Sequence, residues 1–209
     1  MEEKKLNEQE SLELITRMIN QTKKETAVGS GNVFLVWGYL CTFMSLAVVA
    51  MTFLTRNGGW GWLYIAIPAL GFAIAGIVGR SMNKKYKNPG TYQQKSINAV
   101  WACLSGVFAA YAAVCFLHWS NTTCWTGMFL LGLLLPGLGT YCTGVILKES
   151  ALQLCGFIGV LVGLNFLGEM CTSGMAIPIK WPVVMAITMI ITLVVPGHVL
   201  NYKAKKANS

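Results

Sequence analysis

The sequence predicts an all-α polytopic membrane protein, with six transmembrane helices arranged as three hairpins and a cytoplasmic amphipathic helix in front of them. Three observations predict this class. The 209 residues are 55% hydrophobic and only 11% charged, whereas a soluble domain carries about 25% charged residues. Six apolar segments have the length needed to cross a hydrocarbon core of about 30 Å. Basic residues gather in every second loop between these segments, as positive-inside topology requires.

Residues 1–32 form a polar segment in which we expect one helix and a joint to the membrane domain. The first apolar run starts too late and is too long for a signal peptide. A helix is predicted over residues 7–25, because Asn7 and Glu10 have the spacing of a capping box. Its apolar stripe consists of Leu12, Ile15, Met18 and Ile19. This stripe is expected to lie on the membrane surface, to pack under the bundle or to pair with a partner protein.

The transmembrane domain is predicted over residues 33–200. Ser150 and Gln153 repeat the capping-box pattern, so the fifth helix should begin at Ser150. Residues 201–209 are predicted to be a basic cytoplasmic tail. The six spans are 33–54, 62–79, 97–117, 128–147, 151–168 and 183–200.

The distribution of lysine and arginine predicts the orientation. The loop at residues 80–95 carries five bases and no acid, so it should stay on the cytoplasmic side. Of the 16 lysine and arginine residues, only Arg56 and Lys180 fall on the opposite side. Both termini are therefore predicted to be cytoplasmic. The net charge of +8 is then explained by contact with anionic lipid headgroups rather than with nucleic acid.

The second and fourth spans share a pattern that suggests an internal repeat. Pro68-Ala-Leu-Gly71 and Pro136-Gly137-Leu-Gly139 are both followed by G-[IV]-[IV]-x-[KR] at the same distance. The first and third spans agree more faintly, at Trp37 and Trp101. One interpretation is tight helix packing, because glycine lets a neighbouring backbone approach. The other is a set of hinges around a central site, with residues 136–139 as the best candidate for a helix break.

Three polar residues are candidates for a ligand or hinge site. Glu169 is expected to be solvated or paired with Lys180, although a buried Glu169 would bind a proton or a cation. Asn165 is expected to join two helices through a hydrogen bond. His198 follows Pro196 and is expected to satisfy carbonyl groups that the proline leaves free.

No catalytic, metal or cofactor motif occurs. There is no H-E-x-x-H, Walker loop or G-x-S-x-G pattern, and the cysteines form no C-x-x-C metal motif. The sequence leaves a disulfide between Cys124 and Cys171 undecided. Both cysteines fall in loops on the non-cytoplasmic side, where a disulfide can form. Tryptophans gather on that side as an interfacial belt, or alternatively as an aromatic cage for a cation beside Glu169. They are Trp60, Trp62, Trp119, Trp125 and Trp181.

The join of LNEQESLELITRMINQTKKE to GSGNVFLVWGYL resembles a group of small bacterial six-helix inner-membrane proteins that have no assigned activity. The resemblance covers the N-terminal helix and the first span, and the rest mainly by hydropathy. It implies a bacterial inner membrane and no particular activity. The residues themselves favour a non-enzymatic accessory or regulatory subunit that binds a partner through residues 7–25. The alternative is a small transporter or ligand-binding bundle, and a membrane enzyme ranks third.

Overall fold

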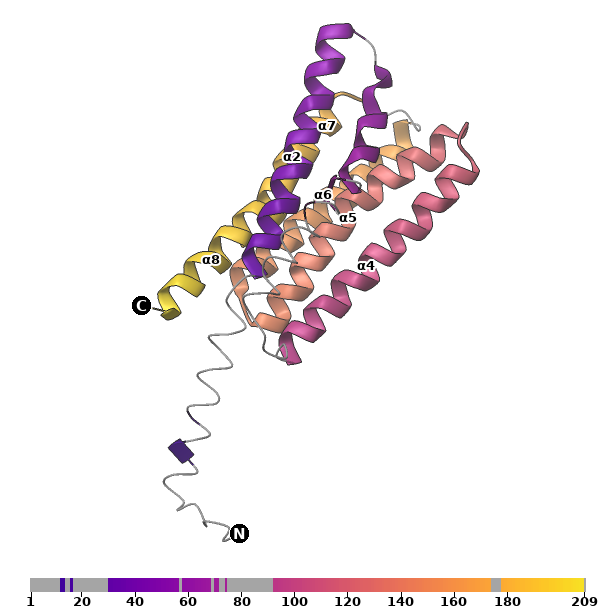
Figure 1. The fold of residues 1–209 in the computed structure, drawn as a ribbon. Coiled ribbons are helices and arrows are strands. Elements are labelled where there is room, and N and C mark those ends of the chain that lie inside the picture. Colours follow the sequence, from indigo (N-terminus) through magenta and orange to yellow (C-terminus); the bar gives the residue numbers. More distant parts are fainter. Residues whose placement is uncertain are drawn as a thin grey trace.

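The computed structural model describes residues 12, 13, 16, 30–56, 58–68, 70, 71, 74, 92–173 and 178–208. Within these ranges every regular element is a helix and none is a strand, which confirms the predicted all-helical class (Figure 1). Five helices in these ranges are long and apolar enough to cross a membrane. They correspond to the first, third, fourth, fifth and sixth predicted spans.

Most of the helices extend a few residues beyond the predicted spans. The first is α2 (Ser30–Thr55), followed by the 3-10 helix η1 (Gly58–Ile65). Next come α4 (Tyr92–Leu117), α5 (Thr122–Leu147) and α6 (Ser150–Ser173). The last span is continuous and contains α7 (Lys180–Met189), the π-helix η2 (Ile190–Val194) and α8 (Val195–Asn208).

Three predicted segments are described only in part or end differently from the prediction. The span predicted at 62–79 starts as the 3-10 helix η1, and of its later part only 66–68, 70, 71 and 74 are described, all helical. In the helix predicted at 7–25, only Leu12, Glu13 and Thr16 are described, and they are helical. The basic tail predicted at 201–209 is helical over most of that range, because α8 continues to Asn208.

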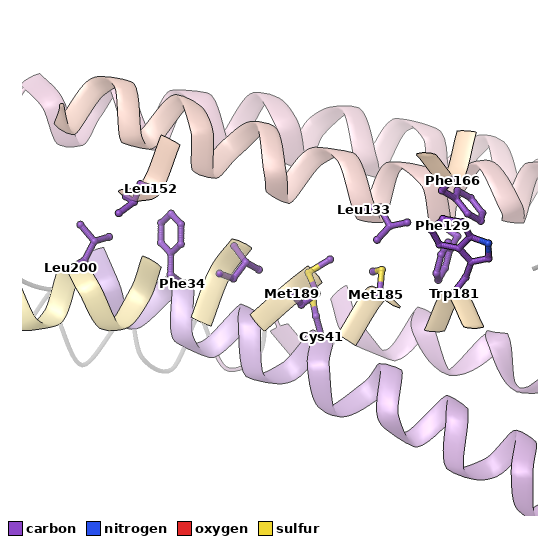
Figure 2. Close-up of a cluster of buried hydrophobic side chains, with 11 residues drawn as sticks. Phe34, Cys41, Phe129, Leu133, Leu152, Phe166, Trp181, Met185, Met189 and Leu200 are labelled. Atoms are coloured by element: carbon purple, nitrogen blue, oxygen red, sulfur yellow. The ribbon is translucent and has the colours of Figure 1, made fainter. Parts of the chain in front are cut away.

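The helices pack in two groups that share one core. α5 pairs closely with α6, and α4 lies along α5 at the edge of the bundle (Figure 1). α2 packs against all three parts of the last span. Figure 2 shows the core between them, which runs from Phe34, Leu152 and Leu200 at one end to an aromatic group at the other. That group consists of Phe129, Phe166 and Trp181.

A tight turn and glycine contacts hold α5 against α6. Lys148 adopts the left-handed conformation with φ 56°, and the next N–H, from Glu149, returns to the Gly144 carbonyl at 2.8 Å. α6 then begins at Ser150 as predicted, but the Gln153 side chain donates to the Gly144 carbonyl rather than closing a capping box. A Cβ added to Gly156 would overlap the backbone of α5. Such contact between backbones is what small residues allow in membrane helices.

The π-helix η2 keeps one face of the last span on the core. In an α-helix of 3.6 residues per turn, Trp181 and Ala204 would face directions about 140° apart. Both are buried, at 3% and 8% exposed. In η2 the Val195 N–H bonds to the Ile190 carbonyl, five residues back, which inserts one extra residue into the turn. The extra residue reduces the difference to about 40°, so both ends of the span reach the core.

Candidate functional site

The π-helix and Pro196 create an unusual polar site in the middle of the bundle. Proline has no N–H, so the carbonyl four residues before it loses its helical hydrogen bond. In α-helical spacing that carbonyl belongs to Thr192, and the Thr140 hydroxyl of α5 donates to it at 2.8 Å. Thr140 and Thr192 are both fully buried. The carbonyl freed by the proline is therefore satisfied by a neighbouring helix.

The prediction that His198 satisfies these carbonyls is therefore wrong for the carbonyl of Thr192. His198 is exposed, and its Nε2 lies 2.9 Å from the hydroxyl oxygen of Tyr39 on α2. Pro196 and Gly197 are buried on the side of α8 that faces the core, whereas the imidazole of His198 lies on the exposed side. His198 thus joins the outer edges of two helices.

Two further threonines extend the buried polar site. Thr192 donates to the Thr188 carbonyl and Thr188 to the Val184 carbonyl, each at 2.8 Å. Thr143 donates to the Gly139 carbonyl at 2.7 Å and accepts from the Trp101 indole N–H at 3.1 Å. The hydroxyl cluster, defined as Thr140, Thr143, Thr188 and Thr192, was not predicted from the sequence. Its one available signal was Thr192, placed four residues before Pro196 in an apolar span.

The repeat motif residues contact equivalent tryptophans. A Cβ on Gly139 would come within 2.8 Å of the Trp101 indole, and a Cβ on Gly71 would overlap the Trp37 indole. Both glycines are buried and Pro68 is partly buried within a helical turn. Each tryptophan lies on the span that precedes its glycine in the chain. The two glycines are thus needed because an aromatic ring covers them.

The hinge interpretation offers residues 136–139 as a candidate helix break, and α5 has no break there. α5 runs from Thr122 to Leu147 with Pro136 inside it. Gly137 is buried, and a Cβ there would lie 2.8 Å from the Val160 backbone nitrogen of α6. The irregular backbone lies instead in η2 of the last span, which touches α5 through the bond from Thr140.

Glu169 lies at the end of the bundle opposite the chain's last lysines. Its carboxylate forms an ion pair with Lys180 at 2.7 Å, as expected for an acid paired at the end of a span. Lys180 also lies 5.7 Å from the centre of the Trp181 ring. This end therefore holds a cation of its own over an aromatic ring.

The five tryptophans named above form three separate groups rather than one cage. Trp60 lies 6.1 Å from Trp62, and Trp119 lies 5.2 Å from Trp125. Trp181 is buried and its ring is 4.6 Å from that of Phe166. The rings of this third group contact one another directly, so they fill the space that a bound cation would need. The arrangement does not support the cage interpretation.

The remaining candidates do not join one site. Asn165 is exposed on α6, and no hydrogen bond involves its amide within the described ranges. Cys124 and Cys171 both carry free thiols. Among the described residues, no three His, Cys or Glu side chains come together to hold a metal ion. Asn121 caps α5 by accepting from the Thr123 N–H at 3.0 Å.

Comparisons with protein-family models, with curated proteins and with solved structures found no match. The class of the protein therefore rests on its helices. Five described helices of 23 to 27 residues meet the length and apolarity of transmembrane spans, and they define a multi-pass helical membrane protein.

Proposed function

We propose that the chain is a six-span protein of the bacterial cytoplasmic membrane, with both termini in the cytoplasm. Support comes from the lysines, because Lys95, Lys148 and Lys203 lie at helix ends on one side and Lys180 on the other. The spans form three hairpins, and the first two hairpins are copies of one unit. The equivalent contacts of Trp37 with Gly71 and of Trp101 with Gly139 support this duplication.

We propose further that the protein is a non-enzymatic accessory or regulatory subunit that acts through its surface. The observation that carries this proposal is a core filled along its length by the protein's own side chains (Figure 2). Leu133, Leu152, Phe166 and Met189 are at most 1% exposed. Side chains packed in this way have little free volume around them. Recognition is then left to the outer faces and to the cytoplasmic segment.

The partner is expected to bind the helix predicted at residues 7–25, with membrane lipids surrounding the bundle. The apolar stripe gives the anchors of a helix-in-groove contact. The experiment is quantitative affinity purification from native membranes in mild detergent, comparing the full chain with a variant lacking residues 7–25. Loss of a stoichiometric partner in the deletion variant, with the bundle still folded by circular dichroism, is the expected result.

A point-variant pair makes this test specific to the stripe. Leu12→Ser with Ile15→Ser should release the partner. Asn20→Ser with Gln21→Ser changes residues on the polar side of the same predicted helix and should retain it. Equal recovery of the partner with both variants would refute binding through the apolar stripe.

A second function, that of a small transporter or ligand-binding bundle, is favoured by one observation. π-helical turns occur frequently at functional sites, and η2 contributes Thr192 to the hydroxyl cluster. This function predicts that Thr140→Val abolishes uptake or ligand binding in protein that remains folded. Gly139→Leu is not a clean test, because the new side chain would displace Trp101. A variant with unchanged uptake would remove the hydroxyl cluster as the site.

A further inference from the structure

The outward face of α6 combines apolar side chains with one polar amide. Leu154 is 62% exposed and Leu161 is 49% exposed. Asn165, Gly168 and Thr172 continue the same face and are also exposed. Exposed leucines on a membrane helix are ordinary lipid contacts. The amide of Asn165 is the feature that lipid does not explain.

Asn165 lies within the span rather than at its end. Glu169 and its ion pair with Lys180 mark the end of the span, and Asn165 is about 6 Å below Glu169 at 1.5 Å per residue. Among the residues that the structure describes, the amide has no hydrogen-bond partner. Hydrocarbon offers no donor or acceptor, so an unsatisfied amide at this depth is unfavourable. The described residues of the chain therefore offer no partner to Asn165.

We propose that this face of α6 binds the same face of a second copy of the chain, with Asn165 hydrogen-bonded across the contact. The seam consists of Leu154, Leu161, Asn165, Gly168 and Thr172. Its last four residues have the 4-3-4 spacing of a helix–helix seam. The proposal concerns self-association and does not rest on the function proposed above.

Membrane topology restricts how two copies meet on this seam. Both copies insert in the same orientation, so a two-fold axis relating them runs along the membrane normal. Such an axis brings each seam residue opposite its own copy. An amide carries both donors and an acceptor, so two Asn165 side chains satisfy each other. A carboxylate or an ammonium group could not pair with itself in this way.

Gly168 makes the close approach possible. A Cβ placed on Gly168 meets nothing within 4 Å of it in the described part of the chain, in contrast to Gly156 on the buried face of the same helix. It lies one turn from Asn165 and one turn from Thr172, as in small-xxx-small contacts. The open glycine and the amide thus lie side by side on the seam.

The experiment measures self-association of the full chain in liposomes by energy transfer between donor- and acceptor-labelled copies, over a range of protein-to-lipid ratios. Native protein should dimerise, and Asn165→Val should weaken the dimer by about five- to tenfold. Asn165→Gln should restore most of the affinity. Ser105→Val, which removes an exposed polar group from α4, is the matched control and should have no effect.

Disulfide cross-linking in membranes tests the seam directly. In a variant carrying Cys171→Ser and Thr172→Cys, oxidation should give a species of twice the chain mass. Cys171→Ser alone retains the exposed Cys103 of α4 and should remain a single chain. A monomeric native protein, equal dimerisation of Asn165→Val, or a cross-linked product of another mass would each overturn the proposal.

Discussion

The bond from Thr140 to the Thr192 carbonyl gives the sharpest prediction about stability. Thr140→Val keeps the shape of the side chain and removes the hydroxyl that donates to this carbonyl at 2.8 Å. Pro196 has no N–H to replace it. Thr140 and Thr192 are both fully buried, so water cannot take over the bond. The variant should therefore leave a carbonyl unsatisfied in the core.

The expected loss follows from two magnitudes. An unsatisfied buried acceptor costs about 1–3 kcal/mol, whereas hydrogen bonds between membrane helices average about 0.6 kcal/mol and reach about 1.7 kcal/mol. Because Pro196 removes the usual alternative donor, we expect a value near the upper end, about 1.5 kcal/mol. The free energy of unfolding is measured by titration with SDS in mixed micelles, followed by circular dichroism.

A double-mutant cycle with Pro196→Ala tests the cause. Alanine restores the N–H that can donate to the Thr192 carbonyl. In that background Thr140→Val should cost less than about 0.5 kcal/mol, because the carbonyl then has a second donor. An equal cost in both backgrounds would show that the stabilisation does not depend on the proline.

Thr188→Val is the matched control on α7. Thr188 is 3% exposed, but its hydroxyl donates to the Val184 carbonyl of its own helix, where the backbone offers a donor as well. Its replacement should change the free energy of unfolding by less than about 0.5 kcal/mol. A cost as large as that of Thr140→Val would contradict the assignment of the effect to the carbonyl freed by Pro196.

Three further predictions use the same unfolding measurement. Gly156→Ala should destabilise the protein by about 1–3 kcal/mol because its methyl group meets the α5 backbone, whereas Gly106→Ala, with open space around it, should be neutral or stabilising by up to about 1 kcal/mol. Lys203→Met removes the ion pair with Glu149, which is partly exposed, so it should cost at most about 1 kcal/mol and less at high salt. Deletion of Ile191 should be tolerated, because it turns η2 into an α-helix with the same buried face. Deletion of Val199 should be destabilising, because it rotates the buried Leu200 away from the core.

Apolar length and end signals predicted most of the described spans. Val33–Leu54 was expected and α2 covers Ser30–Thr55, since a charge-free run of this length has one stable conformation in lipid. Ser150 was expected to start a helix and does so. The boundaries differ by a few residues because helices continue past the apolar run into polar turns, as α8 does to Asn208.

The parts of the site that depend on register could not be predicted. The sequence shows that Pro136 and Pro196 each remove a backbone donor, but not which side chain lies opposite. Thr140 meets Thr192 only because α5 packs at one particular height against the last span. No pattern in the sequence reveals that height, because it depends on how the side chains of two distant helices interlock.

Asn165 shows the same limit in a different way. The sequence predicted that its amide would join two helices, which is the usual role of asparagine in a span. The direction in which the amide points depends on how α6 is rotated against α5, and the glycine contacts of Gly156 and Gly159 set that rotation. They bury the opposite face of α6 and leave Asn165 exposed.

The π-helix combines two requirements that a regular helix could not meet together. Trp181 must reach the aromatic end of the core and Ala204 the other end, and a regular helix would turn one of them away by about 140°. One extra residue in η2 corrects this rotation. η2 also ends at Val194, two residues before Pro196, where the backbone already lacks one donor, so the irregular turn and the proline disturb the same stretch of helix. Thr140 then satisfies the carbonyl that remains. A single contact from α5 thus stabilises the stretch where the last span departs from α-helical geometry.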